Sequence, residues 1–167
     1  NEAQKHFDKA LESFQKSFEL LKKEDRTKAG DALKYQVKAL QHLNRNDTKR
    51  QAIALIQNFF LHHQAIFEAM SDPDELLYLY ALISSHLSET EVEFATFSEE
   101  ILQDTIKRFP RGKFASASLY LLGMLYHRQQ HYALAEAHLE RVAKDYPNST
   151  FAGDALFWAA DAAEKQK

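Results

Sequence analysis

Histidine is the residue type in this chain with the most obvious potential for metal binding, since there are eight histidines and no cysteine. His127 and His131 are four residues apart, the spacing at which a helix presents two side chains to one ion. A turn is predicted between them at 129–130, which removes that geometry. His131 and His138 share a predicted helix but lie two turns apart, too far for one ion. We therefore expect no metal site.

The sequence does not support nucleophilic or acid–base catalysis either. The sequence has no G-x-S-x-G motif, no cysteine and no glycine-rich phosphate loop. Ser84, Ser85 and His86 are consecutive, so on a helix their side chains point in different directions and form no triad. The adjacent carboxylates Glu99 and Glu100 have no evident partner base or apolar pocket. We predict that the protein is not an enzyme and uses no cofactor.

Acidic residues are concentrated in the middle of the chain. The segment 51–106 has ten carboxylates and not one Lys or Arg, although the net charge of the whole chain is only −3. Acidic residues favour the first turns of helices, which explains part of this pattern. The segregation also suggests a surface for a basic or amphipathic partner. The residues that we assign to this acidic surface are Glu89, Glu91, Glu93, Glu99 and Glu100.

The elements that would position these residues are helices. Apolar residues make up 45% of the chain and recur at helical spacing, as at Phe7, Leu11 and Phe14, and no segment alternates with a period of two. Only four glycines and three prolines interrupt the pattern. No apolar run approaches the roughly 20 residues that a membrane span needs. The predicted fold is all-α, with eight helices at 2–22, 26–43, 47–70, 74–88, 91–109, 113–128, 132–146 and 150–166.

The C-terminal third of the chain repeats itself. At an offset of 37 residues, Phe109-Pro110 aligns with Tyr146-Pro147, and Phe114-Ala115 aligns with Phe151-Ala152. A period of about 34–47 residues built from helix pairs is typical of an α-solenoid, in which each pair buries its apolar face only against its neighbours. The predicted architecture is therefore an α-solenoid of antiparallel helix pairs.

A pattern of small and large apolar residues spans 115–147. Its members are Leu119, Leu122, Gly123 and Tyr126 in the first helix, Tyr132, Ala135, Leu139 and Val142 in the second, and Pro147 at the end. Gly123 and Ala135 are small where two antiparallel helices would cross closely. This pattern resembles a tetratricopeptide repeat. Gln130 departs from it, because the family often has Gly in the tight turn between the two helices.

The resemblance implies one tetratricopeptide-like domain over 1–167. It has degenerate helix pairs over 1–109, a clear repeat at 113–147 and a terminal helix at 150–166. The Phe/Tyr-Pro ending followed by Phe-Ala is more specific. Over 104–166 it is similar to bacterial envelope proteins of the BamD and Tol–Pal coordinator type, which are non-enzymatic scaffolds.

The function that this resemblance implies is a scaffold for protein–protein interaction in bacterial envelope assembly or maintenance. The alternative is a cytoplasmic chaperone for secreted proteins. A signal peptide with a lipid anchor ahead of Asn1 would favour a periplasmic or outer-membrane-associated protein, and a direct Met start would favour the cytoplasm. The net charge of −3 gives no electrostatic reason to expect nucleic-acid binding.

The inner face of a tetratricopeptide array comes mainly from the first helix of each pair. On that basis the expected partner-binding groove consists of Tyr120, Met124, His127, Phe157, Trp158 and Asp161. An aromatic and apolar face suits an amphipathic or apolar protein segment, with Tyr120 and Trp158 as anchors. The acidic surface makes a basic partner, or self-association, a further possibility.

Overall fold

The computed structural model describes residues 2–88 and 91–167, with the side chains of 5–88 and 91–167. Within these ranges every regular element is a helix, and no strand is present. The predicted all-α fold class is confirmed. The helices are α1 (Glu2–Glu24), α2 (Arg26–His42), α3 (Asn46–His62), α4 (Gln64–Ala69), α5 (Pro73–Leu87), α6 (Glu93–Arg108), α7 (Ala115–Arg128), α8 (Tyr132–Asp145) and α9 (Ala152–Glu164).

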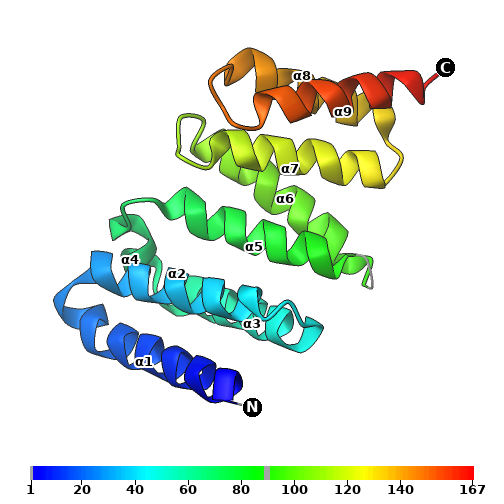
Figure 1. The fold of residues 1–167 in the computed structure, drawn as a ribbon. Coiled ribbons are helices and arrows are strands. Elements are labelled where there is room, and N and C mark those ends of the chain that lie inside the picture. Colours follow the sequence, from blue (N-terminus) through cyan, green and yellow to red (C-terminus); the bar gives the residue numbers. More distant parts are fainter. Residues whose placement is uncertain (1, 89–90) are drawn as a thin grey trace.

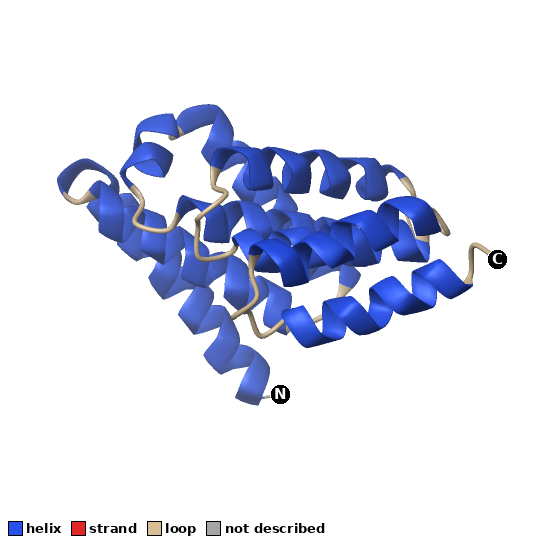
Figure 2. Ribbon diagram, turned by 90° about the horizontal axis from the view of Figure 1, so that it is seen from above, coloured by secondary structure: helices blue, strands red, loops and turns tan. Residues whose placement is uncertain are grey.

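The helices stack into one elongated array, with the N-terminus at one end and the C-terminus at the other (Figure 1). The near layer contains α1, α2, α5, α7 and α9, and the layer behind it contains α3, α6 and α8. Figure 2, viewed from above, shows that loops and turns join these helices directly. We call the near layer the inner layer, because it contains the first helix of each pair.

Antiparallel pairing follows the chain in the C-terminal half. α5 packs on α6 and α7 packs on α8, while α6 also contacts α7 and α8 also contacts α9. The antiparallel pair predicted at 113–128 and 132–146 is confirmed, and the structure places it at Ala115–Arg128 and Tyr132–Asp145. Each helix of the outer layer therefore lies between two helices of the inner layer, as a solenoid requires.

The array has two apolar cores that meet at α5 and α6. The N-terminal core includes Leu33, Phe59 and Leu76, which are almost completely buried, and the C-terminal core includes Leu119 and Leu139, which are fully buried. Ile101 of α6 is partly buried against both cores. Apolar packing is therefore continuous along the whole array.

The single helix predicted over 47–70 is wrong, because the structure breaks it into α3 and α4 at His63. His63 has a φ of −133° and a ψ of 36°, outside the helical region, and its ring packs on Phe18 and Phe59 with ring centroids 5.2 and 5.9 Å apart. The break redirects α4 onto α2, where Thr27 Oγ1 donates to the Ala69 carbonyl at 3.0 Å. The redirected segment buries Phe67 in the N-terminal core.

The crossing of α7 and α8 has the close approach that the small residues indicate. Gly123 and Ala135 are both buried, and a Cβ atom at Gly123 would lie 2.6 Å from Leu139 Cγ. The turn between the two helices places Gln130 at a φ of 63°, in the left-handed region that favours glycine. The residue that departs from the family pattern therefore adopts a backbone conformation for which glycine is favoured.

Successive repeats are tied together by their loops and by stacked aromatic rings. Tyr78 of α5 stacks on Phe114 with ring centroids 5.3 Å apart, and Tyr120 of α7 stacks on Phe151 at 5.0 Å. The buried carboxylate of Asp74 accepts a hydrogen bond of 2.7 Å from the Phe114 backbone N–H. The Phe of each Phe-Ala motif thus anchors the start of one inner helix to the inner helix before it.

Replacement of Gly123 by Leu should destabilise the fold by about 1–3 kcal/mol, because the added side chain overpacks the crossing with Leu139. Gly153→Leu is the matched control, since a Cβ atom at Gly153 has no neighbour within 4 Å. Thermal unfolding followed by circular dichroism measures both variants. A Gly123→Leu protein that melts with the parent would contradict the close crossing.

Candidate protein-interaction face

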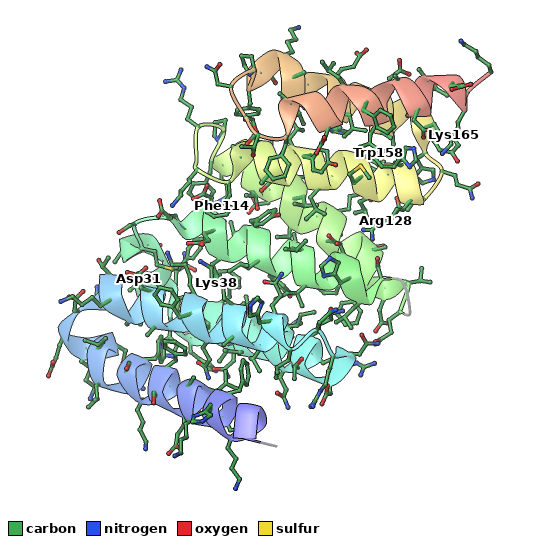
Figure 3. The ribbon with its side chains drawn as sticks, in the orientation of Figure 1. Asp31, Lys38, Phe114, Arg128, Trp158 and Lys165 are labelled. Atoms are coloured by element: carbon green, nitrogen blue, oxygen red, sulfur yellow. The ribbon has the colours of Figure 1, made fainter. Side chains whose placement is uncertain are left out.

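The inner layer presents side chains from three of its helices, α2, α7 and α9, on one side of the molecule. Figure 3 shows Asp31 and Lys38 on α2, Arg128 at the end of α7, and Trp158 and Lys165 near α9, all on the near side. The six residues of the predicted groove lie on α7 and α9, which are neighbours in this layer. Their binding role stays a prediction.

Trp158 and Tyr120 link α7 to α9. The Trp158 ring meets the His127 ring edge-on, with centroids 5.2 Å apart, and the Tyr120 ring stacks on Phe151, the residue before α9, at 5.0 Å. Burial, and then the negative charge of Asp154, raise the pKa of Tyr120. Both side chains are only partly exposed because they pack against the C-terminal core. Trp158 and Tyr120 therefore stabilise the packing between α7 and α9 and also form part of the predicted groove.

A polar network borders the aromatic residues. His127 Nε2 and Asp161 Oδ2 are 2.6 Å apart, and Lys165 Nζ lies 2.8 Å from the same carboxylate oxygen. Hydrogen bonds from Lys165 and then His127 lower the pKa of Asp161. Since the His127 side chain is only 10% exposed, the imidazole serves to hold α7 against α9. This pair was not evident in the sequence, because its members are 34 residues apart.

Phe157 is the most exposed member of the predicted groove. Its side chain is 66% exposed, and its ring packs edge-on against Trp158 with centroids 5.3 Å apart. Met124 is partly buried against the C-terminal core. The face therefore combines one accessible aromatic ring with a partly buried support of Trp158, Tyr120 and Met124.

The described residues of the predicted acidic surface lie on or next to α6, whereas those of the groove lie on α7 and α9. Glu93 and Glu100 are exposed on α6, in the outer layer. Glu91 pairs with Arg50 at 2.5 Å. Glu99 Oε1 accepts a hydrogen bond of 2.7 Å from the Tyr126 hydroxyl. Glu89 lies outside the described residues.

Another acidic residue of the same segment belongs to a buried charge cluster between α2 and α5. Glu75 is paired with Lys34 at 3.1 Å and also with Lys38, and Lys34 is paired with Asp31 at 3.0 Å. Burial alone would raise the pKa of Glu75, but hydrogen bonds from Lys38 and Lys34 outweigh it and lower the pKa. Part of the acidic segment is therefore used inside the fold.

A second hollow of the inner layer was not indicated by the sequence. A cavity of about 790 Å³ lies between α1, α2 and α5, with Phe14, Tyr35 and Leu82 among its lining residues. On α2, Tyr35, Lys38 and His42 follow one another at three and four residues, so they share one helix face. That shared face of α2 is the feature of the sequence that could have indicated this cavity. The contributions of α1 and α5 depend on tertiary packing.

The His and Ser residues considered for metal binding or catalysis lie in or next to α5, α7 and α8. His127 and His131 are separated by the turn at 129–130, as expected. Ser84 and Ser85 are buried in α5, and Ser85 Oγ donates to the Leu82 carbonyl within its own helix. In the part of the chain that the structure describes, no group of three His, Asp or Glu side chains is arranged to hold a metal ion.

The fold and this face define a helical-repeat protein. Residues 117–149 match the family model of the tetratricopeptide repeat, a helix-pair unit that generally mediates protein–protein interaction and is not catalytic. The matched segment covers α7 from Ala117 onward and all of α8, the pair that contains the Gly123 crossing. A search of curated proteins found no match. No helix among the described residues is long and apolar enough to cross a membrane.

The two adjacent aromatic residues of α9 should respond differently to truncation. Trp158→Ala should lower the free energy of unfolding by about 2 kcal/mol, less than the ~3–5 of a fully buried Trp, because its contacts to His127 and to the C-terminal core are lost. Phe157→Ala should change it by less than about 0.5 kcal/mol, since the side chain is exposed. Urea unfolding of both variants measures the difference. Equal losses would show that the Phe157 side chain is also required for the fold.

His138 should make the fold sensitive to mild acid. Burial lowers the pKa of His138, its ring stacks on Tyr126 at 5.3 Å, and Nδ1 is buried without a hydrogen bond. Because the unfolded chain then binds the proton more tightly, stability is present above the ordinary histidine pKa of about 6.5 and declines as the pH falls below it.

The variant His138→Phe should reduce the loss of stability between about pH 7 and pH 5, since the ring remains and the titrating group is removed. His63, whose pKa is also lowered by burial, should keep part of the slope. Exposed His6 provides the matched control His6→Phe. Denaturation midpoints across this pH range test the expectation, and an unchanged slope in His138→Phe would contradict it.

Proposed function

We propose that this protein is a non-enzymatic scaffold that binds another protein through the inner face of α7 and α9. The observation that carries the proposal is the exposed ring of Phe157 beside Trp158, with Trp158 and Tyr120 held in place by packing against the C-terminal core. Aromatic residues held in place before binding lose little conformational entropy when a partner docks. The tetratricopeptide match over α7 and α8 supports the same class of function.

The partner that suits this face is an amphipathic or apolar segment. Phe157 and Met124 offer apolar contact, and the Asp161–Lys165 pair at the border offers polar contact. A segment with one apolar stripe, such as an amphipathic helix, presents both kinds of group at suitable spacing. The exposed Glu93 and Glu100 of α6 remain a second candidate surface, suited to a basic partner.

We also propose a role in bacterial envelope assembly or maintenance, with a periplasmic or outer-membrane-associated location. The support for this is the sequence resemblance in the Phe/Tyr-Pro and Phe-Ala motifs, whose Phe114 and Phe151 join successive inner helices. The competing assignment is a cytoplasmic chaperone for secreted proteins. Fractionation of the source cells, followed by detection of the full-length protein, distinguishes the two locations.

Site-specific photocrosslinking tests the binding face. A photoreactive phenylalanine analogue replaces Phe157 on the inner face, Glu100 on the acidic surface, or Leu134, which is 47% exposed on outer helix α8. These positions are at least partly exposed, so the substitution should leave the fold intact. After irradiation in the source cell, we expect position 157 to give a discrete crosslinked protein and position 134 to give none.

The same experiment separates the alternatives. Crosslinks from position 100 alone would assign binding to the acidic surface instead of the groove. Crosslinks only to a second copy of this chain would replace the scaffold by self-association. If positions 157 and 100 give no crosslink beyond the level of position 134, neither surface is the binding face.

A further inference from the structure

A cleft on the outer side of α5 has the form of a second binding site, remote from Phe157. Its volume is about 310 Å³, within the range of about 300–1,000 Å³ that is usual for binding pockets. The apolar lining comes from Phe60 of α3, Leu77 and Tyr80 of α5, and Ile101 of α6. Since α3 and α6 belong to the layer behind α5 (Figure 1), this outer cleft lies between two outer helices and has α5 as its floor.

The outer cleft is open where the equivalent space in the next unit is filled. Tyr80 of α5 and Tyr126 of α7 hold equivalent places, because each accepts a hydrogen bond of 3.0–3.1 Å from a glutamine 23 residues earlier in the chain. Beside Tyr126, the ring of His138 on α8 stacks on the tyrosine with centroids 5.3 Å apart. Beside Tyr80, the next outer helix contributes Ile101, and a cleft remains. An apolar side chain that entered this cleft would bury apolar area.

The charge at the outer cleft is negative. The charged side chains that line it are Glu100, Asp104 and Arg108. Asp104 and Arg108 form an ion pair at 3.0 Å, whereas no described Lys or Arg pairs with Glu100. Phe60 and Arg108 are in the last turns of α3 and α6, and each of these helix ends adds the equivalent of about half a negative charge. Leu77 lies beyond the first turn of α5, so the positive end of that helix is farther away.

Other cations nearby do not reverse this polarity. α4 and α5 contain no Lys or Arg. Lys49 and Arg50 of α3 are at least about 15 Å from Phe60 along the helix, beyond the Debye length of about 8 Å at physiological ionic strength. Arg50 is also paired with Glu91. Lys107 is exposed at the end of α6 and does not line the cleft.

α6 extends the negative wall beyond the cleft. Glu93, Phe97, Glu100 and Asp104 are exposed and follow one another at three and four residues, so they share one helix face. The Phe97 side chain, 46% exposed, lies between the two glutamates on this face. The exposed residues on the last turns of α3 include no Lys, Arg, Asp or Glu; they are Gln57, Asn58, Leu61 and His62. The outer cleft therefore has one acidic wall and one wall without such charges.

We propose that the outer cleft binds an amphipathic helix of another protein, with Lys or Arg along one edge of its apolar stripe. An apolar side chain of that helix packs on Phe60 and Ile101, and its basic groups pair with Glu93 and Glu100. These two glutamates are about 10 Å apart along α6, a distance that two basic residues seven positions apart on the bound helix match. This inference rests on the acidic surface of the proposed scaffold and does not require the groove on α7 and α9.

The test uses a display library of 16-residue helical peptides, with a fixed stripe of Leu and random residues elsewhere, selected on the immobilised full chain. We expect the enriched peptides to carry Lys or Arg along one edge of the stripe. Their affinities are then measured by fluorescence anisotropy with fluorescein-labelled copies. Binding should weaken at least threefold in Glu100→Gln and in Phe97→Ala, and it should weaken as the salt concentration rises. Glu100→Asp, which keeps the charge, should retain most of it.

The next outer helix, α8, offers a matched control for each variant. Glu140→Gln removes an exposed carboxylate, and Leu134→Ala truncates a side chain that is 47% exposed. Both controls should bind as the parent does, because neither residue lines the outer cleft. Amide chemical-shift changes on addition of the peptide should centre on 57–61, 77–80 and 97–104. Circular dichroism checks that every variant remains folded.

Three outcomes would overturn the inference. The first is a selection that returns no peptide, or peptides without basic residues. The second is basic peptides that bind Glu100→Gln and Phe97→Ala as tightly as the parent. The third is basic peptides whose binding is lost only in Phe157→Ala, which would move the site to α9 and leave the proposed scaffold function in place. Failure of the crosslinking at position 157 would have the opposite meaning, since it bears only on the groove on α7 and α9.

Discussion

The structure depends on the contact of each outer helix with the two inner helices beside it. α8 shows this constraint most clearly, because Leu139 fits against Gly123 of α7 while α8 also packs on α9. Burial of apolar area between neighbours is the main favourable term for such an array. The outer helices therefore supply much of the packing that the inner helices need, and side chains on the open side of the inner layer remain available for other contacts.

α5 extends this principle across the middle of the molecule, where the two apolar cores meet. It packs on α3, α6 and α7 and contributes Leu76 to one core and Ala81 to the other. Its first turn holds two buried acids, Asp74 and Glu75, each with a partner on another element. A buried carboxylate without a partner would be costly, so these pairs also fix how α2, α5 and the loop before α7 are placed.

The pattern of residues along the chain was sufficient to predict the repeat, but it was not sufficient to predict the contacts between distant elements. The close helix crossing at Gly123 and Ala135 could be predicted from the size and spacing of these residues, because a close crossing requires small residues wherever it occurs. The break at His63 could not, since it depends on Phe18 of α1, 45 residues away, packing on the His63 ring. The same limit applies to the site. The resemblance to a tetratricopeptide repeat placed Trp158 and Phe157 in the predicted groove, whereas the cavity beside Tyr35 exists only because tertiary packing brings α1, α2 and α5 together.

The groove on α7 and α9 and the cavity beside Tyr35 lie on one layer, which has a consequence for how the scaffold would bind. Stacked pairs such as Tyr78 with Phe114 and Tyr120 with Phe151 connect the inner helices along the array, so the spacing between the sites is set by folded structure. Two modest contacts on one partner then act at a high effective concentration, because the first contact places the second near its site. A partner that contacts both the groove on α7 and α9 and the cavity beside Tyr35 would gain from both contacts. Tight binding would therefore not require either site to be strong alone.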